Sequence, residues 1–274
     1  MSSVIAIYRD VRFSPNSVAA DRSIMDATIG RLGQHQVLAI AEHELGEQHR
    51  ADLFLSMGRL PRTIQLLKAR EQQNRALVIN NAAALERFSR RHILQMMQEN
   101  GIPTPPETGE HGYWVKRADS AAQTKADVVF CSDKTTAEQT KRNFALRGVD
   151  DVVVSAHVVG DLIKFYGVGD SFFWYFYPTD NGHSKFGNEK RNGIAQHFGF
   201  NLSELRAVAT RLVRLTGIDV YGGDCIVDCE GRFSIIDFND WPSFSPCREQ
   251  AADAISLFVN QLLAAQNNSQ QKNG

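Results

Sequence analysis

Residues 1–80 alternate between short apolar runs and longer stretches in which apolar residues recur every three or four positions. The short runs are typical of buried β-strands, and the longer stretches are typical of helices that bury one face. Strands are expected at residues 4–8, 36–41, 52–56 and 76–79, and helices at residues 17–32 and 61–70. This alternation predicts parallel βαβ units. No GxGxxG follows the first strand, so a dinucleotide-binding Rossmann domain loses its main support.

The rest of the chain also mixes helices and strands. Helices are expected at residues 81–101, 136–147, 201–215 and 247–264, and strands at residues 112–117, 127–131, 151–159, 172–177, 224–228 and 232–239. The aromatic run FFWYFY at residues 172–177 is expected in the core, because no basic residue interleaves it as in a platform for nucleic-acid bases. The polar tail 266–274 is expected to be disordered. The predicted fold class is therefore α/β with α+β subdomains.

The last two strands flank a Glu-Gly turn at residues 230–231, where glycine permits a left-handed backbone. If this turn is a two-residue hairpin loop, Cys229 pairs with Arg232, and Asp224 lies opposite Asp237. Directly opposed like charges repel each other. Asn239 points to the same face as Asp237, because it lies two residues further along the strand. The alternative is a solvated hairpin whose acids face water.

Two carboxylates and one amide oxygen at the end of a hairpin suit a hard cation. Mg²⁺ takes oxygen ligands and is often held partly by substrate phosphates. The hairpin therefore predicts a magnesium site at Asp224, Asp237 and Asn239.

Composition narrows the range of partners and compartments. The chain has 274 residues and a net charge of −1, so neither nucleic acid nor an anionic membrane is an expected partner. No apolar run reaches transmembrane length, and residues 1–10 lack a signal-peptide layout. Four cysteines do not make a disulfide scaffold in a chain of this length, and Cys225 and Cys229 are expected to be reduced packing thiols. The expected compartment is the cytoplasm.

The pattern Asp224, Asp237-x-Asn239, Pro242-Ser243 resembles the metal-binding strands of the ATP-grasp superfamily, including its glutathione synthetase-like and ribosomal-protein-modifying ligases. There the acids and the asparagine hold Mg²⁺ against the ATP phosphates. The family usually has Glu where Asp237 stands, although Asp occurs in its inositol-phosphate kinase branch. The resemblance implies ATP and one or two Mg²⁺ ions as cofactors.

Basic residues upstream extend the resemblance. The helix at 81–101 ends in GIPTP and looks like the family's passage into its central domain, which places Arg90 at a phosphate-contacting position, with Arg91 as the alternative. Lys116 lies within an aromatic and apolar strand, where an unpaired ammonium is costly to bury, and it resembles the lysine that grips the nucleotide phosphates. Lys164 resembles the basic residue of a second phosphate-facing strand. The loop at 118–126 lacks the glycines with which many relatives cover the triphosphate.

Three further groups of positions follow from the resemblance. Residues 151–159 look like the hinge strand whose backbone binds adenine, although the usual acid is missing at Ala156. Asp161 could bind ribose, and a role in a turn fits equally well. The basic loop at 180–193 resembles the loop beside the transferring phosphate. The implied adenine-binding residues are Ser155, Ala156, His157 and Val158, and the implied catalytic residues are Lys190 and Arg191.

The resemblance implies three subdomains, at residues 1–80, 81–155 and 156–265, with ATP sandwiched between the last two. In most of the family, a substrate carboxylate attacks the γ-phosphate, and an amine captures the acyl phosphate. The chain is therefore expected to be a carboxylate–amine ligase with a small-molecule or peptide substrate, and a homodimer is possible. The alternatives are a small-molecule kinase and a nucleotide-binding protein without turnover. Arg9, Arg12 and Arg59 lie near strand ends and could meet an anionic substrate, or they could be solvated surface.

Overall fold

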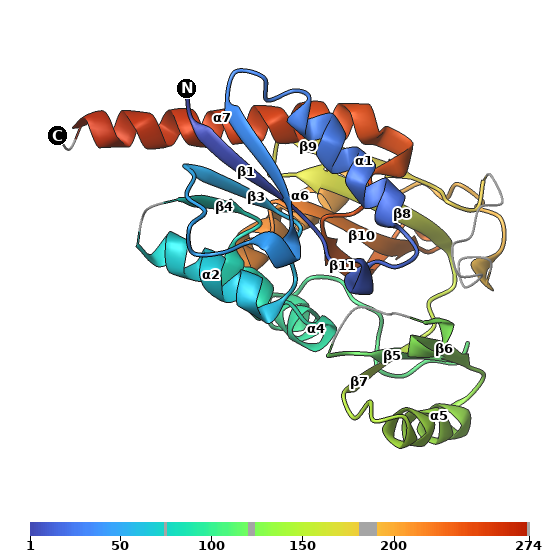
Figure 1. Cartoon of the computed structure of the whole chain (residues 1–274). Coiled ribbons are helices and arrows are strands. Elements are labelled where there is room, and N and C mark those ends of the chain that lie inside the picture. Colours follow the sequence, from blue (N-terminus) through green and yellow to red (C-terminus); the bar gives the residue numbers. More distant parts are fainter. Residues whose placement is uncertain (74–75, 120–123, 181–190, 273–274) are drawn as a thin grey trace.

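The computed structural model describes residues 1–73, 76–119, 124–180 and 191–272, and for residues 269–272 it describes only the backbone. The described strands form three sheets, which we call sheets A, B and C in the order of their first strands. Sheets A and C lie together in the main body of the molecule, whereas sheet B and its helix stand apart at the lower right (Figure 1).

Sheet A is the parallel sheet that the alternation of residues 1–80 predicts, and that prediction is confirmed. Its strand order is β2-β1-β3-β4, with β1 at Ser3–Tyr8, β2 at Gln36–Ala41, β3 at Leu53–Ser56 and β4 at Leu77–Ile79. Alternate residues of β1 point to opposite faces, so Val4 joins one core cluster and Ile5 joins another. Helix α2 (Pro61–Gln72) contributes Leu67 to the cluster of Ile5, and α1 (Val18–Ile29) contributes Ile24 to the other.

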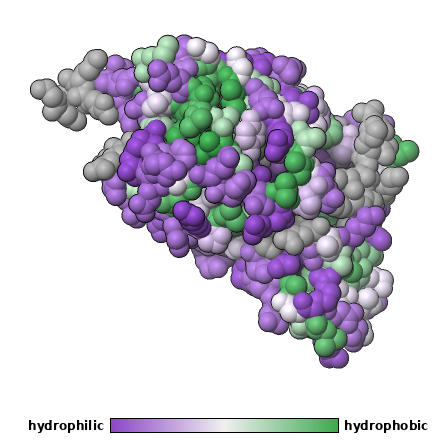
Figure 2. Space-filling view, viewed as in Figure 1, coloured by the Kyte–Doolittle hydropathy of each residue, from purple (hydrophilic) through white to green (hydrophobic). Residues whose placement is uncertain are grey.

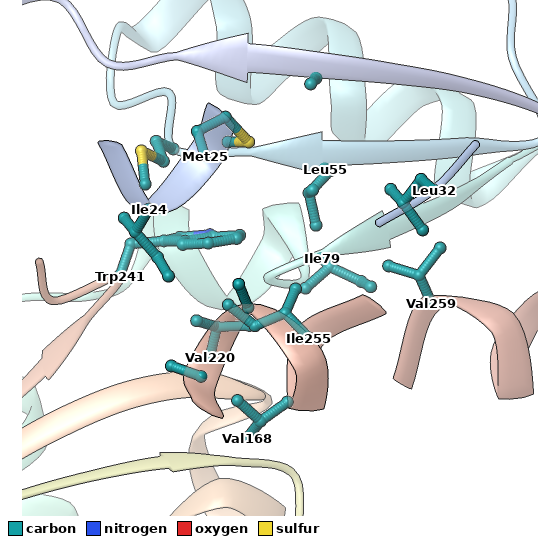
Figure 3. Close-up of a cluster of buried hydrophobic side chains, with 14 of the residues drawn as sticks. Ile24, Met25, Leu32, Leu55, Ile79, Val168, Val220, Trp241, Ile255 and Val259 are labelled. Atoms are coloured by element: carbon teal, nitrogen blue, oxygen red, sulfur yellow. The ribbon is translucent and has the colours of Figure 1, made fainter. Parts of the chain in front are cut away.

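Helix α7 (Arg248–Lys272) ties sheet A to sheet C. Its side chains Ile255 and Val259 lie between α1 and the strand residues Val168 and Val220, and all four are fully buried (Figure 3). The helix runs to Lys272, so the prediction of a disordered tail over residues 266–274 is wrong for residues 266–272. The tail contains no proline, and no glycine before its last residue, so nothing in its sequence terminates the helix.

Sheet C is antiparallel and has the order β11-β10-β8-β9, with β8 at Asp161–Val168, β9 at Phe172–Phe176, β10 at Val220–Val227 and β11 at Phe233–Asp240. One face packs on α6 (Leu202–Thr216), which begins at the capping residue Asn201 and ends at the left-handed Gly217. The expected helix at 81–101 is divided into α3 (Ala82–Glu86) and α4 (Arg90–Glu99), because the Ser89 side chain caps α4. Both helices share the core of sheet C, although the sequence assigns them to the central subdomain.

Sheet B has the order β6-β5-β7, with β5 at Tyr113–Arg117, β6 at Val128–Cys131 and β7 at Val152–Ala156. Helix α5 (Lys134–Leu146) covers one face and contributes Phe144 to a small separate core that includes Val115. Because this core is small and separate, sheet B is an independent layer that faces the rest of the molecule with its other side.

The surface in the view of Figure 1 is mostly hydrophilic, and a group of apolar side chains gathers in its upper part (Figure 2). Edge strand β2 leaves Leu38 48 % exposed. No helix in the described ranges has the length and apolar character that crossing a bilayer requires.

Asn80 makes a polar link between sheets A and C. Its amide nitrogen donates to the Val220 carbonyl oxygen (2.9 Å), and its amide oxygen accepts from the Val220 N–H (2.7 Å). The Trp241 N–H also donates to the Val220 carbonyl (2.9 Å). Without the Asn80 side chain, the Val220 N–H would therefore lose its partner while the carbonyl would keep one.

We expect Asn80→Ala to lower the free energy of unfolding by about 1–3 kcal/mol, because it leaves a buried N–H unpaired. Urea denaturation of the whole chain measures the change. Asn143→Ala, on the exposed face of α5, is the control and should stay within about 0.5 kcal/mol of the parent. Equal effects of the two substitutions would contradict the role of this link.

Candidate active site

The hairpin of β10 and β11 places Asp224 directly opposite Asp237, as the sequence predicts. The expected turn is wrong by one residue, however. The loop closes between Asp228 and Arg232, whose backbone groups are 2.9 Å apart, and Gly231 takes a left-handed φ of 79° within it. A register shift between Asp224 and Cys225 then restores the predicted pairing.

The register shift is a bulge that serves the same site. Asp224 pairs with Asp237, whereas Cys225 pairs with Ile235, so Ile236 is the extra residue of β11. Its carbonyl oxygen accepts a hydrogen bond from the Lys116 ammonium group (3.1 Å). The bulge therefore supplies an acceptor to a lysine that reaches across from sheet B.

Three positively charged side chains from three different elements meet the two acids. A guanidinium nitrogen of Arg90, the first residue of α4, lies 3.4 Å from an Asp237 carboxylate oxygen. The Lys164 ammonium group, on β8, lies 3.3 Å from an Asp224 oxygen. Lys116 completes the set from β5, and burial lowers its pKa although the charge of Asp237 acts in the opposite direction. The site thus has more positive than negative side chains, which suits an anionic ligand.

The two acids differ in their surroundings. Burial raises the pKa of Asp224 in spite of Lys164. Burial acts in the same direction on Asp237, but the charges of Arg90 and Lys116 outweigh it and hold the pKa of that carboxyl below its usual value. The sequence predicts mutual repulsion alone. The structure adds compensating cations for each acid: Lys164 on the adjoining strand β8 for Asp224, and Arg90 and Lys116, from α4 and sheet B, for Asp237.

Asn239, the third predicted metal ligand, lies on the same strand as Asp237. Its side chain is exposed and hydrogen-bonds to Asp237. In the described part of the chain, no group of three or more His, Cys, Asp or Glu side chains could hold a metal ion. A Mg²⁺ ion at Asp224 and Asp237 would therefore take further oxygen ligands from a bound phosphate, and the donor set fits this.

The N-terminus of α4 adds to the attraction for anions. Its first turn carries Arg90 and Arg91 and no acid, and Ser89 caps it. The free N–H groups and the dipole at a helix N-terminus favour negative charge, so cations there are unfavourable unless an anion joins them. Of the two arginines, Arg90 reaches Asp237, whereas Arg91 pairs with Asp151 at the surface. This supports Arg90 over the alternative.

A cleft between sheet B and β11 runs beside these charges. Its walls come from α4, β5, β7 and β11, and its lining includes Arg90, Lys116, Ser155 and Asp237. Ser155 is the predicted hinge residue that faces this cleft.

The other hinge residues are engaged within the protein. The N–H of Ala156 donates to the Pro106 carbonyl oxygen, and that of His157 donates to the Gly112 carbonyl oxygen, each at 2.8 Å. The Val158 carbonyl accepts from the Asn192 amide (3.2 Å). An adenine contact at the hinge would therefore use backbone groups other than these three.

Beside the hinge, three rings form a cluster that receives Arg191. The Trp114 indole N–H donates to Nδ1 of His157 (3.1 Å), and both rings meet Phe130 edge to face. Burial lowers the pKa of His157, with Arg191 acting in the same direction. The Arg191 guanidinium carbon lies 3.4 Å from the Phe130 ring centroid. Its catalytic role stays a prediction, and Lys190 lies outside the described residues.

Asp161 is buried and holds a neighbouring segment. Its two carboxylate oxygens accept from the backbone N–H groups of Gln196 (2.7 Å) and Phe198 (2.8 Å). These contacts favour the turn role that the sequence leaves open beside ribose binding.

The arginines near the ends of β1 and β3 are ion-paired. Arg9 lies 3.1 Å from Asp21, and Arg59 donates to Asp240 (3.0 Å), a residue whose side chain is fully buried. Arg12 pairs with its neighbour Asp10 and is exposed. Asp240 directly follows Asn239. Its sequence context does not identify it as a buried ion-pair partner, because Arg9 and Arg59 lie far away in the chain. In this structure, all three arginines are therefore paired with carboxylates of the protein.

We expect the two acids to respond oppositely to neutralisation without ligand. Asp224→Asn removes a partly buried charge whose pKa is raised, so the protein should be at least as stable at neutral pH. Asp237→Asn leaves Arg90 and Lys116 without their counter-charge and should cost about 1–3 kcal/mol. Urea melts in the presence of a chelator measure both.

The pH dependence provides the control for this pair. A carboxyl with a raised pKa holds its proton more tightly in the folded state, so the parent loses stability as the pH rises above about 3.9, the usual value for Asp. Asp224→Asn should lack this part of the loss. If Asp224→Asn and Asp237→Asn changed the stability in the same direction, the two acids would not differ in their surroundings as described.

No protein-family model matches the chain, and no curated protein matches its sequence. Solved structures do match. The chain superposes on a D-alanine–D-alanine ligase from Bacillus anthracis with a TM-score of 0.66 and 12% identity, over 100% of both chains. It superposes on a RimK domain protein of the ATP-grasp type from Sphaerobacter thermophilus with a TM-score of 0.63 and 16% identity, over 93% of this chain and 98% of the other. The ATP-grasp ligase PsnB, solved with a minimal precursor, gives a TM-score of 0.58 and 13% identity, over 97% and 99%.

These proteins resemble the chain over nearly its whole length. At such low identity, the likeness concerns the fold and leaves the reaction open. The arrangement of sheets and its solved counterparts lead to one conclusion: the chain has the ATP-grasp fold.

Proposed function

We propose that the protein is an ATP- and Mg²⁺-dependent ligase, which activates a substrate carboxylate as an acyl phosphate for attack by an amine or a similar nucleophile. The observation that carries the proposal is the meeting of Arg90, Lys116 and Lys164 with Asp224 and Asp237. Support also comes from the solved structures of the same fold, which include D-alanine–D-alanine ligases and PsnB.

The ion pairs of the free protein suggest how the triphosphate would bind. Arg90 is paired with Asp237, and Lys164 with Asp224. When phosphate oxygens approach the cations and the acids turn to the metal, each charge exchanges one partner for another. Little additional charge of the protein then has to be desolvated, which favours binding at a partly buried site.

Positioning and charge would supply most of the catalysis. Mg²⁺ would neutralise phosphate charge when bound. Lys116 and Arg90 would hold the phosphates from the side of sheet B and α4, and Lys164 from the side of sheet C. Because the substrate carboxylate itself attacks phosphorus, the protein need not provide a nucleophile.

A small-molecule kinase with a hydroxyl acceptor is the second candidate. The observation in its favour is Asp237, where the family more often has Glu. A nucleotide-binding protein without turnover is the third, because the loop at 118–126 lacks glycine.

We expect MgATP to stabilise the protein at a single saturable site. At a hundredfold excess over Kd, the gain is about 2.7 kcal/mol, or about 5–10 °C in Tm for a chain of this size. Lys116→Met should weaken ATP binding at least about tenfold, because it removes a cation from the sheet B side of the cleft. Thermal melts with and without Mg²⁺ measure both effects.

Lys141→Met, on the exposed face of α5, is the matched control and should bind as the parent does. If millimolar MgATP leaves Tm unchanged, the nucleotide site is in the wrong place or absent.

We expect turnover to release inorganic phosphate along with ADP and a condensed product. A phosphorylated acceptor without free phosphate would instead identify the kinase. Saturable MgATP binding without either product would identify the third candidate. Mass spectrometry and a phosphate assay on mixtures of amino acids, peptides and polyols separate the three.

A further inference from the structure

Three aromatic residues share a face of sheet C with the charged site. Lys164 on β8 lies opposite Asp224 on one side and Phe176 on the other. Two residues further, Tyr166 lies opposite Gly222 and Trp174. Side chains directly opposite each other, or two residues apart along a strand, point to the same face of a sheet. Phe176, Trp174 and Tyr166 therefore continue the row that begins with Asp224 and Lys164.

The three rings form one contiguous patch. Tyr166 and Trp174 are nearly parallel, at 5° and 6.2 Å between centroids, and Trp174 lies 5.2 Å from Phe176. All three side chains are partly exposed. On the opposite face of the same strands, Phe165 is fully buried beneath Phe173. The aromatic run that the sequence assigns to the core is thus divided between two faces. Residues 173 and 175 pack against the core of sheet C, whereas residues 174 and 176 lie on the charged face, where Trp174 also packs against the core shared with α7.

Residues of β10 and of the segment after β11 hold the Tyr166 ring in place. A Cβ atom on Gly222 would come within 2.9 Å of both the Tyr166 ring and Pro242, so only glycine lets that ring lie against β10. The fully buried Phe244 lies 5.3 Å from Tyr166 on the loop after β11. A ring fixed in this way is a rigid wall, which can bind a flat ligand with little loss of entropy.

Two further arginines near this face are already occupied by protein carboxylates. Arg9 and Arg59, which stand at the strand ends where an acidic substrate could be received, are ion-paired with Asp21 and Asp240. The charged pair next to the three rings is Lys164 with Asp224, at one end of their row.

We propose that Tyr166, Trp174 and Phe176 form the acceptor subsite, and that it takes an aromatic or bulky apolar group of the substrate whose carboxylate is activated beside Lys164. This inference rests on the proposed function, and it names the substrate class: aromatic amino acids, aromatic carboxylic acids or peptides ending in such residues. Ring-to-ring contact and apolar burial would favour these over aliphatic analogues.

The test compares matched acceptors, 3-phenylpropionate with propionate and phenylalanine with alanine, as stimulants of ADP release by the whole chain with MgATP. We expect the ring-bearing member of a pair to act at about tenfold lower concentration. Trp174→Ala should raise its KM about tenfold and leave the KM for ATP unchanged. Trp174→Phe should keep the preference, and Tyr175→Ala, on the opposite face of the same strand, is the matched control.

A second readout does not require turnover. Binding of 3-phenylpropionate should quench tryptophan fluorescence saturably in the parent, and Trp174→Phe should abolish the quench. If Trp174→Ala does not fold, Phe176→Ala replaces it. The subsite would be overturned by any of three results. These are equal use of aromatic and aliphatic acceptors, equal effects of Trp174→Ala and Tyr175→Ala, and the absence of a saturable quench with every ring-bearing acid. Absence of MgATP stabilisation would instead overturn the proposed function, so the two failures are distinguishable.

Discussion

The opposition of Asp224 and Asp237 across β10 and β11 is the constraint on which the rest of the site depends. Two carboxylates at neighbouring strand positions destabilise the hairpin unless positive charge is near. The protein meets this requirement from three directions, with Arg90 on a helix, Lys116 on a separate sheet and Lys164 on the adjoining strand. The same cations that make the acids tolerable without a ligand also make the cleft attractive to phosphate.

Packing contacts between distant parts of the chain fix the positions of Arg90, Lys116 and Lys164. Helix α7 and Asn80 join sheet A to sheet C, and α4 packs into the core of sheet C while it presents Arg90 to β11. The buried pair of Arg59 and Asp240 fixes the end of β11 directly after Asn239. Removing one member of such a pair costs more than the pair contributes, so these contacts define one arrangement and disfavour others.

The two sides of the site differ in chemistry. Charged residues occupy the cleft side, where a triphosphate would need neutralisation. Aromatic residues occupy the adjoining part of the same face, from Tyr166 to Phe176, where the acceptor would lie. Because fold alone does not fix a reaction, the proposed substrate class is inferred from this change from charged to aromatic surface.

By itself, the sequence determined the alternating architecture of residues 1–80, the hairpin and the opposition of its two acids, because these depend on local periodicity and turn chemistry. It reached that opposition with a turn of the wrong length, which the bulge at Ile236 compensates. Only the tertiary structure decided that Arg90 and Lys116 face Asp237, that Arg9 and Arg59 are ion-paired, and that the rings of residues 172–177 stay partly exposed. Contacts between segments far apart in the chain set charge pairing and exposure, and no local pattern encodes them.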